Sequence, residues 1–167
     1  DQDLYLETLL IPAARDRAEL ATQRAIVTQT WDLVLDGFPC GSELEIHKPP
    51  LTAVTYVKYR DTDGVLQTWA ESNYVVERPA GPRCRRGRLS LACGVSWPST
   101  YGQAGDVTIR FVCGLTTPRA VAPLLKAAML LDVSSLYAHR EGEAPMSETV
   151  AAIYRSHKSH ARTREGR

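Results

Sequence analysis

The chain has 167 residues, of which 44% are hydrophobic and 23% charged, as is usual for a globular protein. This length buries enough surface for a hydrophobic core without a structural metal or disulfide, and it predicts one compact unit or one unit with a large insertion. The formal net charge of +1 excludes a general electrostatic attraction to nucleic acid or membrane, so any such binding must depend on local clusters of charge.

The first predicted element is an amphipathic helix over residues 3–24. Pro12 lies inside it, removes one backbone hydrogen bond and predicts a kink or a break near Leu9. Small side chains after the proline would let another helix pack closely. The apolar positions at helical spacing are Leu4, Leu9, Ile11, Ala14, Ala18 and Ala21.

From Ile26 onward the apolar period changes from about 3.6 residues to about 2, which predicts strands. Asp61-Thr62-Asp63-Gly64 predicts a tight hairpin turn, because its glycine can adopt a positive φ. Val107, Ile109, Phe111 and Cys113 share one face of the last strand. Five or six short strands are expected, at residues 31–36, 54–59, 65–69, 74–77, 88–92 and 106–113.

A second, strongly apolar helix is predicted over residues 118–141, with Thr117 as its cap and Pro118 in its first turn. Its apolar arc spans roughly 200°, about twice what a helix covered on one side needs. One face is therefore expected against the first helix and another against a neighbouring copy, although complete enclosure by its own chain is the alternative. Lys126 and Asp132 interrupt a run that is too short for a membrane span. The side chains expected at the subunit interface are Leu125, Met129, Val133 and Leu136.

Pro145 and Ser147 introduce a short third helix whose buried side is expected to be Val150, Ile153 and Tyr154. The basic tail after it cannot form a core alone and is expected to be mobile until bound. The fold class is therefore α+β. A small helical bundle (residues 1–25 and 116–156) is interrupted by an antiparallel β-sheet or sandwich (26–115) and followed by the tail (157–167).

The four cysteines include no C-x-x-C pair, and nothing resembling a secretory signal precedes them, so we expect free thiols. The chain begins at Asp1 without a methionine, from which we expect a preceding segment. The cysteines are Cys40, Cys84, Cys93 and Cys113.

No constellation of residues supports catalysis. Gly94-Val95-Ser96-Trp97-Pro98 lacks the second glycine of a nucleophile elbow, and the segment 61–64 has too few oxygen ligands for an EF-hand loop. His157 and His160 have no cysteine or carboxylate cluster beside them to complete a zinc site. We therefore expect no enzymatic activity, no metal and no cofactor.

Two basic features could bind a partner. Arg83, Arg85, Arg86 and Arg88 lie within six residues, and repeated around a ring they would face DNA phosphates without reading bases. The alternative is an exposed loop whose charges are screened by solvent. The tail has five Lys or Arg residues after Tyr154 against one Glu, which favours either docking on an acidic surface or disorder.

Three stretches of the chain occur in a distinctive order and spacing. The first contains Ala13-Ala14-Arg15 and Thr28-Gln29-Thr30-Trp31-Asp32-Leu33, and the second runs from Pro49-Pro50-Leu51 to the turn at 61–64. The third contains Trp97-Pro98-Ser99-Thr100-Tyr101 and the segments 107–114, 121–128 and 136–141. Together they resemble the head-to-tail connector proteins of long-tailed phages, also called head-tail adaptors. That family usually has glycine where Gln23 stands.

The resemblance implies a structural virion protein without enzymatic activity. Copies are expected to form a ring of twelve below the portal protein, at the head-tail interface of a particle assembled in the host cytoplasm. The ring would continue the DNA channel and present its far side to a stopper or tail-terminator protein, without contacting a membrane. It implies portal contacts by Arg155, Lys158, Arg162, Arg164 and Arg167. It also implies a DNA- or tail-facing side, with non-specific contact to packaged double-stranded DNA, at Arg83, Arg85, Arg86 and Arg88.

A different class of function stays open from the sequence. The chain would then be a stand-alone protein- or carbohydrate-binding module, whose β region recognises the ligand while the helices serve as scaffold.

Overall fold

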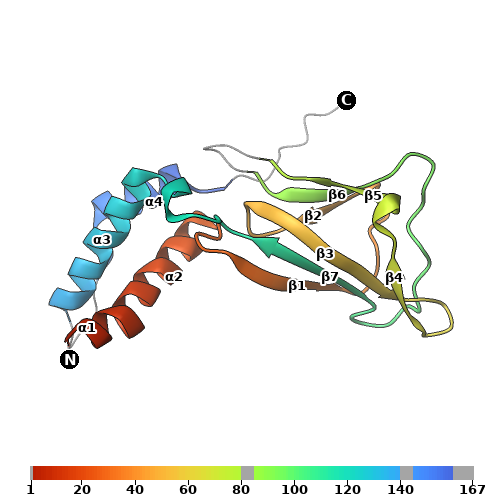
Figure 1. The fold of residues 1–167 in the computed structure, drawn as a ribbon, viewed down its shortest axis with the longest axis horizontal. Helices are drawn as coiled ribbons and strands as arrows, with labels where there is room; N and C mark the ends of the chain where they lie inside the picture. The colour runs from red at the N-terminus through yellow and green to blue at the C-terminus, as the bar shows by residue number, and fades with distance from the viewer. Residues whose placement is uncertain (1, 80–84, 140–144, 160–167) are drawn as a thin grey trace.

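The computed structural model describes residues 2–79, 85–139 and 145–159. Helices lie at one end of an elongated molecule and two antiparallel sheets at the other (Figure 1). The predicted α+β fold class is therefore confirmed.

The N-terminal helix is one continuous rod made of α1 (Gln2–Tyr5), a π-helical turn η1 (Leu6–Leu10) and α2 (Ile11–Thr22). No break occurs at Pro12. The irregularity expected near Leu9 instead takes the form of the π-helical turn, in which the N–H of Ile11 donates to the carbonyl of Leu6, five residues back. The backbone can thus pass the proline, which has no N–H to donate, without leaving the helix.

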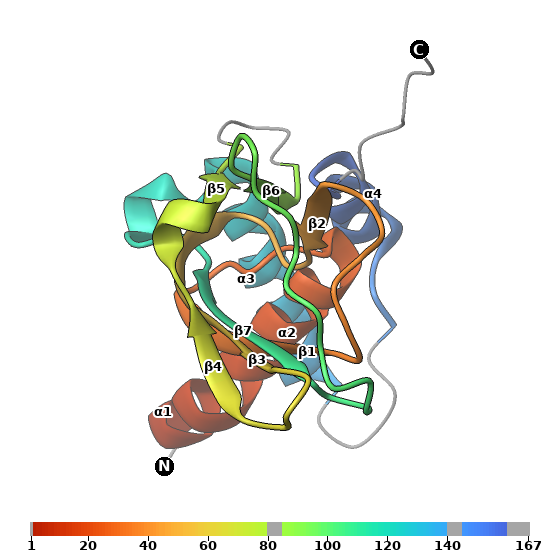
Figure 2. The ribbon, with the colours of Figure 1, turned by 90° about the vertical axis from the view of Figure 1, so that its right-hand side faces the viewer.

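The sequence between the helices forms a sandwich of two sheets. Strand order is β1-β7-β3-β4 in the larger sheet and β2-β6-β5 in the smaller, with every pair antiparallel. Figure 2 shows the two sheets facing each other in front of the helices. The strands are β1 (Gln29–Leu35), β2 (Glu43–Ile46), β3 (Leu51–Arg60), β4 (Leu66–Trp69), β5 (Tyr74–Glu77), β6 (Gly87–Leu91) and β7 (Val107–Cys113).

Buried side chains alternate with partly exposed ones along β7, an inner strand of the larger sheet, and contribute to the sandwich core. Its residues from Val107 to Cys113 are buried at every second position, as the sequence predicted. Burial also raises the pKa of the Cys113 thiol to about 11, which makes it a packing group and not a reactive one. Aromatic rings close the far end of the core, where Phe38 stacks on Trp97 with 4.9 Å between ring centroids.

The predicted turn at residues 61–64 is confirmed as the β3–β4 hairpin. The Asp61 carboxylate accepts hydrogen bonds from the backbone N–H groups of Asp63 and Val65, while Gly64 adopts a φ of 79°. The carboxylate therefore satisfies donors of the turn itself.

The predicted start of the second helix at Pro118 is wrong. Residues Pro118–Ala120 form a short 3-10 turn (η3), and helix α3 (Pro123–Ala138) begins five residues later. Pro123 is the reason, because a proline holds the preceding residue in an extended conformation and has no N–H for a helical hydrogen bond. Ala122 indeed has a ψ of 132°.

Helix α4 (Glu148–Ser156) begins as predicted, since the Ser147 hydroxyl accepts from the N–H of Val150. Helices α2, α3 and α4 enclose a second, smaller core. Its buried residues are Ala18, Ile26, Val121, Leu125, Ala128, Val150 and Tyr154.

The two cores meet where β7 leaves the sandwich. Gly114 has a φ of 100°, and a Cβ there would lie 2.0 Å from the carbonyl oxygen of Val27, so only glycine fits. Ala25 N–H donates to the carbonyl of Pro49 (2.8 Å) across the same junction. This close backbone contact joins the helical end to the sheets.

The rod ends at Gln23, which adopts the left-handed conformation (φ 54°, ψ 38°) and donates its N–H to the carbonyl of Glu19. We expect Gln23→Gly to stabilise the fold by about 1 kcal/mol, because glycine adopts this conformation without a Cβ penalty. Urea denaturation measures the change. Gln23→Ala is the matched control and should give no gain, because alanine keeps the Cβ; an equal gain in both variants would contradict the explanation.

Candidate functional site

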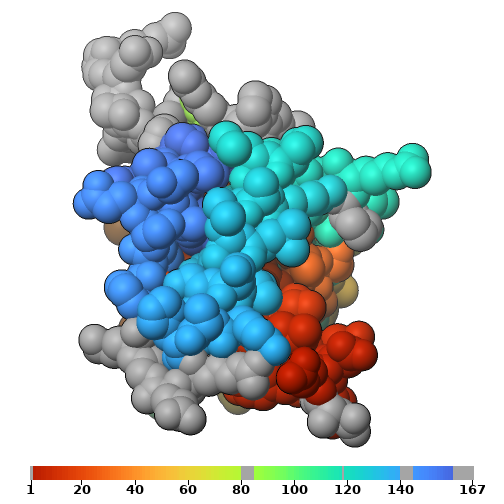
Figure 3. All heavy atoms as spheres, turned by 90° about the vertical axis from the view of Figure 1, so that its left-hand side faces the viewer, coloured from red at the N-terminus to blue at the C-terminus, as the bar shows by residue number. Residues whose placement is uncertain are grey.

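The face of α3 that points away from the chain is apolar. Leu124, Leu130 and Leu131 are 52%, 70% and 53% exposed and lie on a stripe roughly 120° wide, assuming 100° per residue. Figure 3 views the helical end and shows α3 running across its surface between α4 and the N-terminal rod. A stripe of this kind is typical of a protein interface.

The four residues expected at the subunit interface lie on other faces of α3. Leu125 is only 5% exposed and belongs to the core of its own bundle. Met129, Val133 and Leu136 are half-buried at the flank. Their role between subunits stays a prediction, and the exposed stripe was missed because the wide apolar arc does not reveal which half its own chain covers.

A buried charge fixes the packing of the three helices. Asp132 of α3 is 1% exposed, and its Oδ1 lies 3.2 Å from a guanidinium nitrogen of Arg17 on α2. Burial raises the pKa of Asp132, an effect that Arg17 and the neighbouring hydroxyl of Tyr154 oppose. Burial, with the charge of Asp132, also raises the pKa of Tyr154 to about 12. One residue from each of α2, α3 and α4 therefore meets in this polar cluster.

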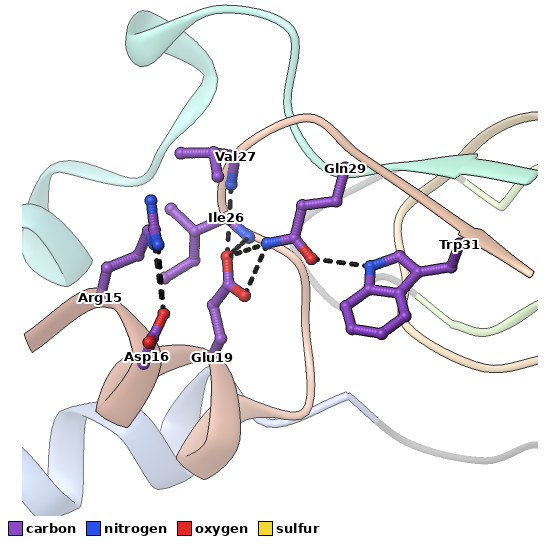
Figure 4. Close-up of polar contacts among 7 residues, drawn as sticks. All are labelled: Arg15, Asp16, Glu19, Ile26, Val27, Gln29 and Trp31. Atoms are coloured by element: carbon purple, nitrogen blue, oxygen red, sulfur yellow. Dashed lines mark hydrogen bonds and ion pairs between the residues drawn. The ribbon is translucent and has the colours of Figure 1, made fainter. Parts of the chain in front are cut away.

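A groove of about 870 Å³ lies where α2 meets the start of β1. Glu19 lines the groove. Its carboxylate accepts hydrogen bonds from the backbone N–H of Ile26 (2.8 Å) and from the side-chain amide of Gln29 (2.8 and 2.9 Å; Figure 4). The same amide group, through its oxygen, accepts from the indole N–H of Trp31 (2.9 Å). The Lys48 ammonium lies 3.5 Å from the centroid of the Trp31 ring. This groove was not predicted, because His47, Lys48 and Arg86 join the lining residues between 15 and 31 only in the folded chain.

The arginine cluster is largely compensated within the chain. Arg86 pairs with Glu45 (3.1 Å), and Arg88 lies between Glu43 and Glu77, which are on the two strands flanking its own. Arg85 is exposed, while Arg83 lies outside the described residues. Carboxylates of the smaller sheet thus neutralise Arg86 and Arg88.

The tail begins at a fixed point. Ser159 N–H donates to the carbonyl of Thr22 (2.9 Å), and its hydroxyl donates to the carbonyl of Gln23 (3.1 Å). Arg155 and Lys158 are exposed beside this anchor. The other residues expected to contact the portal, Arg162, Arg164 and Arg167, lie outside the described part of the chain.

The described residues contain no group of three His, Cys, Asp or Glu side chains that could hold a metal ion. Within the same ranges, no helix has the length and hydrophobicity needed to cross a bilayer. Three surface features are described: the α3 stripe, the groove and the anchored start of the tail.

Solved structures share this fold. A chain in the virion of a native gene transfer agent particle has a TM-score of 0.79 and 22% identity, covering 99% of this chain and 82% of that one. A chain in the neck of the native particle, computed with C12 symmetry, has a TM-score of 0.74 and 23% identity, covering 95% and 84%. A chain in the neck of the empty particle, computed with C6 symmetry, has a TM-score of 0.73 and 23% identity, covering 95% and 78%. No protein-family model matches the sequence, and no curated protein matches it significantly.

The raised pKa of Asp132 gives a pH-dependent prediction. A carboxyl whose pKa is higher in the folded than in the unfolded state stabilises most below its ordinary pKa, and this contribution is lost as the pH rises through the folded value. Asp132→Asn should therefore gain stability relative to the unmodified chain as the pH rises above about 4, the ordinary carboxyl pKa, measured by urea denaturation.

Asp32→Asn is a control for which the expected change of stability with pH has the opposite sign. The hydrogen bond from Arg110 lowers the pKa of Asp32, so its contribution is present at neutral pH and is lost as the pH falls. This variant should lose stability relative to the unmodified chain toward neutral pH. Parallel pH profiles for Asp132→Asn and the unmodified chain would refute the raised pKa of Asp132.

Proposed function

We infer that this chain is a structural protein of the neck of a phage-like particle, an adaptor between head and tail. The observation that carries the inference is the agreement in fold with two neck chains over 95% of this chain. The resemblance to head-tail adaptors in the order of three sequence stretches is independent of that agreement. The absence of a metal-binding cluster among the described residues is compatible with this role but does not carry it.

Copies of the chain assemble into a closed ring, with twelve as the expected number. Two observations support this part of the proposal. One related neck was computed with C12 symmetry, and α3 presents an apolar stripe that its own chain does not cover. A contact between two different surfaces of identical subunits closes into a ring when the rotation between neighbours allows it.

The ring lies below the portal protein and continues the DNA channel. The basic tail binds the portal, since its positive charge suits an acidic surface and Ser159, from which it continues, is held on the end of α2. The β-sandwich, at the end of the molecule opposite the helices, faces a stopper or tail-terminator protein (Figure 1). Packaged DNA meets only non-specific charge at the Arg83 to Arg88 loop, where carboxylates already pair with two of the four arginines.

Deleting the gene is expected to give DNA-filled heads without attached tails, counted by electron microscopy of particle preparations. Complementation with the full chain should restore attachment. A chain ending at Ser159 keeps every described helix and strand, so it should fold but fail to bind portals. Tailed particles after deletion would refute the adaptor role, whereas normal portal binding by the shortened chain would refute only the role of the tail.

The ring interface is tested with two sets of substitutions on one helix. Leu130→Ser with Leu131→Ser should change stability by only about 0.5 kcal/mol, because both side chains are exposed, yet reduce assembly on portals. Leu125→Ala should instead destabilise the bundle by about 2–5 kcal/mol. Mass measurement of portal complexes and thermal denaturation separate the two effects. Full assembly by the double variant would exclude the stripe from the interface.

A further inference from the structure

The groove between α2 and β1 has an excess of positive charge. Both carboxylates that line it are already engaged: Asp16 with Arg15 (3.3 Å), and Glu19 with the N–H groups that it holds. Lys48 is exposed and has no carboxylate partner among the described residues. A ligand with negative charge would therefore meet an unneutralised ammonium here.

The groove also offers exposed apolar area in a fixed arrangement. Leu20 is 82% exposed, Val27 39% and Trp31 43%. The hydrogen bond to Gln29 on one edge and the Lys48 ammonium on its face hold the Trp31 ring in place. Ordered tryptophans beside a cation are common binding hot spots, because little side-chain entropy is lost on contact.

The chain itself contains a segment with the complementary chemistry. Residues 2–14 carry two carboxylates, Asp3 and Glu7, and no basic residue. Neither carboxylate has an ion pair among the described residues. The same segment exposes Leu4, Leu9 and Ile11, by 60%, 54% and 52%. It therefore combines unpaired negative charge with uncovered apolar area.

The segment cannot reach the groove of its own chain. It is the first half of a continuous helical rod, and the last half of that rod, from Arg15 to Arg24, forms one wall of the groove. Twenty-one helical residues from Gln2 to Thr22 extend about 30 Å, so the two sites lie toward opposite ends of a straight element. Only a second copy can bring them together.

We propose that the groove at Lys48 and Trp31 receives the N-terminal helical segment, residues 2–14, of a neighbouring copy. The carboxylates of Asp3 and Glu7 supply the charge for Lys48, and the exposed leucines cover Trp31 and Leu20. Such a contact joins two different surfaces, so it repeats from copy to copy and can close a ring. The inference rests on the proposed function for the closed ring, although the contact itself requires only two copies.

Charge exchange tests this contact in the full chain. Lys48→Glu should weaken self-association about tenfold or more, in sedimentation of concentrated protein or of portal-bound assemblies. Adding Asp3→Lys and Glu7→Lys to the same chain should restore it. Lys58→Glu is the matched control, since Lys58 also lies over an aromatic ring, that of Tyr56, but outside the groove. Unchanged association of Lys48→Glu, or no rescue by the exchange, would overturn the proposal.

Carbodiimide cross-linking gives a second readout that does not depend on a variant. Unlabelled and isotope-labelled copies are mixed, cross-linked and digested, and bonds between Lys48 of one copy and Asp3 or Glu7 of the other are expected. Bonds from Lys48 only to other carboxylates would overturn the proposal. If the chain is absent from necks but its self-association still responds to the charge exchange, the proposed function alone is refuted. If the Lys48→Glu variant forms normal necks, this inference alone is refuted.

Discussion

The carboxylate of Glu19 ties the end of α2 to the start of β1, where the helical end meets the sheets. It lies near the end of α2 and accepts the N–H groups with which the chain turns from the helix into β1. Hydrogen bonds to a charged acceptor are stronger than those between neutral groups, and these satisfy two backbone donors, the N–H groups of Ile26 and Val27, just after α2 ends. The direction in which the sandwich leaves the helical bundle is therefore set by one side chain and by the backbone contact at Gly114.

Two small cores of different character depend on that junction. The sandwich core is aliphatic and aromatic, whereas the helical core contains the ion pair between Arg17 and Asp132. A buried ion pair adds little net stability compared with apolar residues, but removing one partner leaves a costly uncompensated charge. In this bundle the pair favours one register of α2 against α3, because a shift of either helix would separate Arg17 from Asp132.

Much of the fold could be predicted from local signals. Alternation in β7 and the Asp61 turn are encoded within a few residues, and the structure has both. The start of α3 was misjudged because Pro118 and Pro123 both suit a first helical turn, and an apolar pattern continuing across both does not decide between them. Strand β2 was missed because only four residues carry its alternation.

The candidate surfaces were harder to predict, for a physical reason. The arginines of residues 83–88 looked like an uncompensated patch, yet their partners Glu43, Glu45 and Glu77 become neighbours only after strand pairing. The groove likewise exists only once α2 and β1 have been positioned. The sequence predicts the width of the apolar arc on α3, but which half of the arc stays exposed depends on where α2 and α4 pack.

The anchoring of Ser159 has a mechanical consequence. Its two hydrogen bonds end on Thr22 and Gln23, the turn that also forms one margin of the groove. A ligand bound to the chain beyond Ser159 would therefore act on the same turn as a ligand seated beside Trp31. By thermodynamic linkage, each event would change the affinity for the other by the same factor. Binding at the tail and binding in the groove would then be coupled through the turn at Thr22 and Gln23.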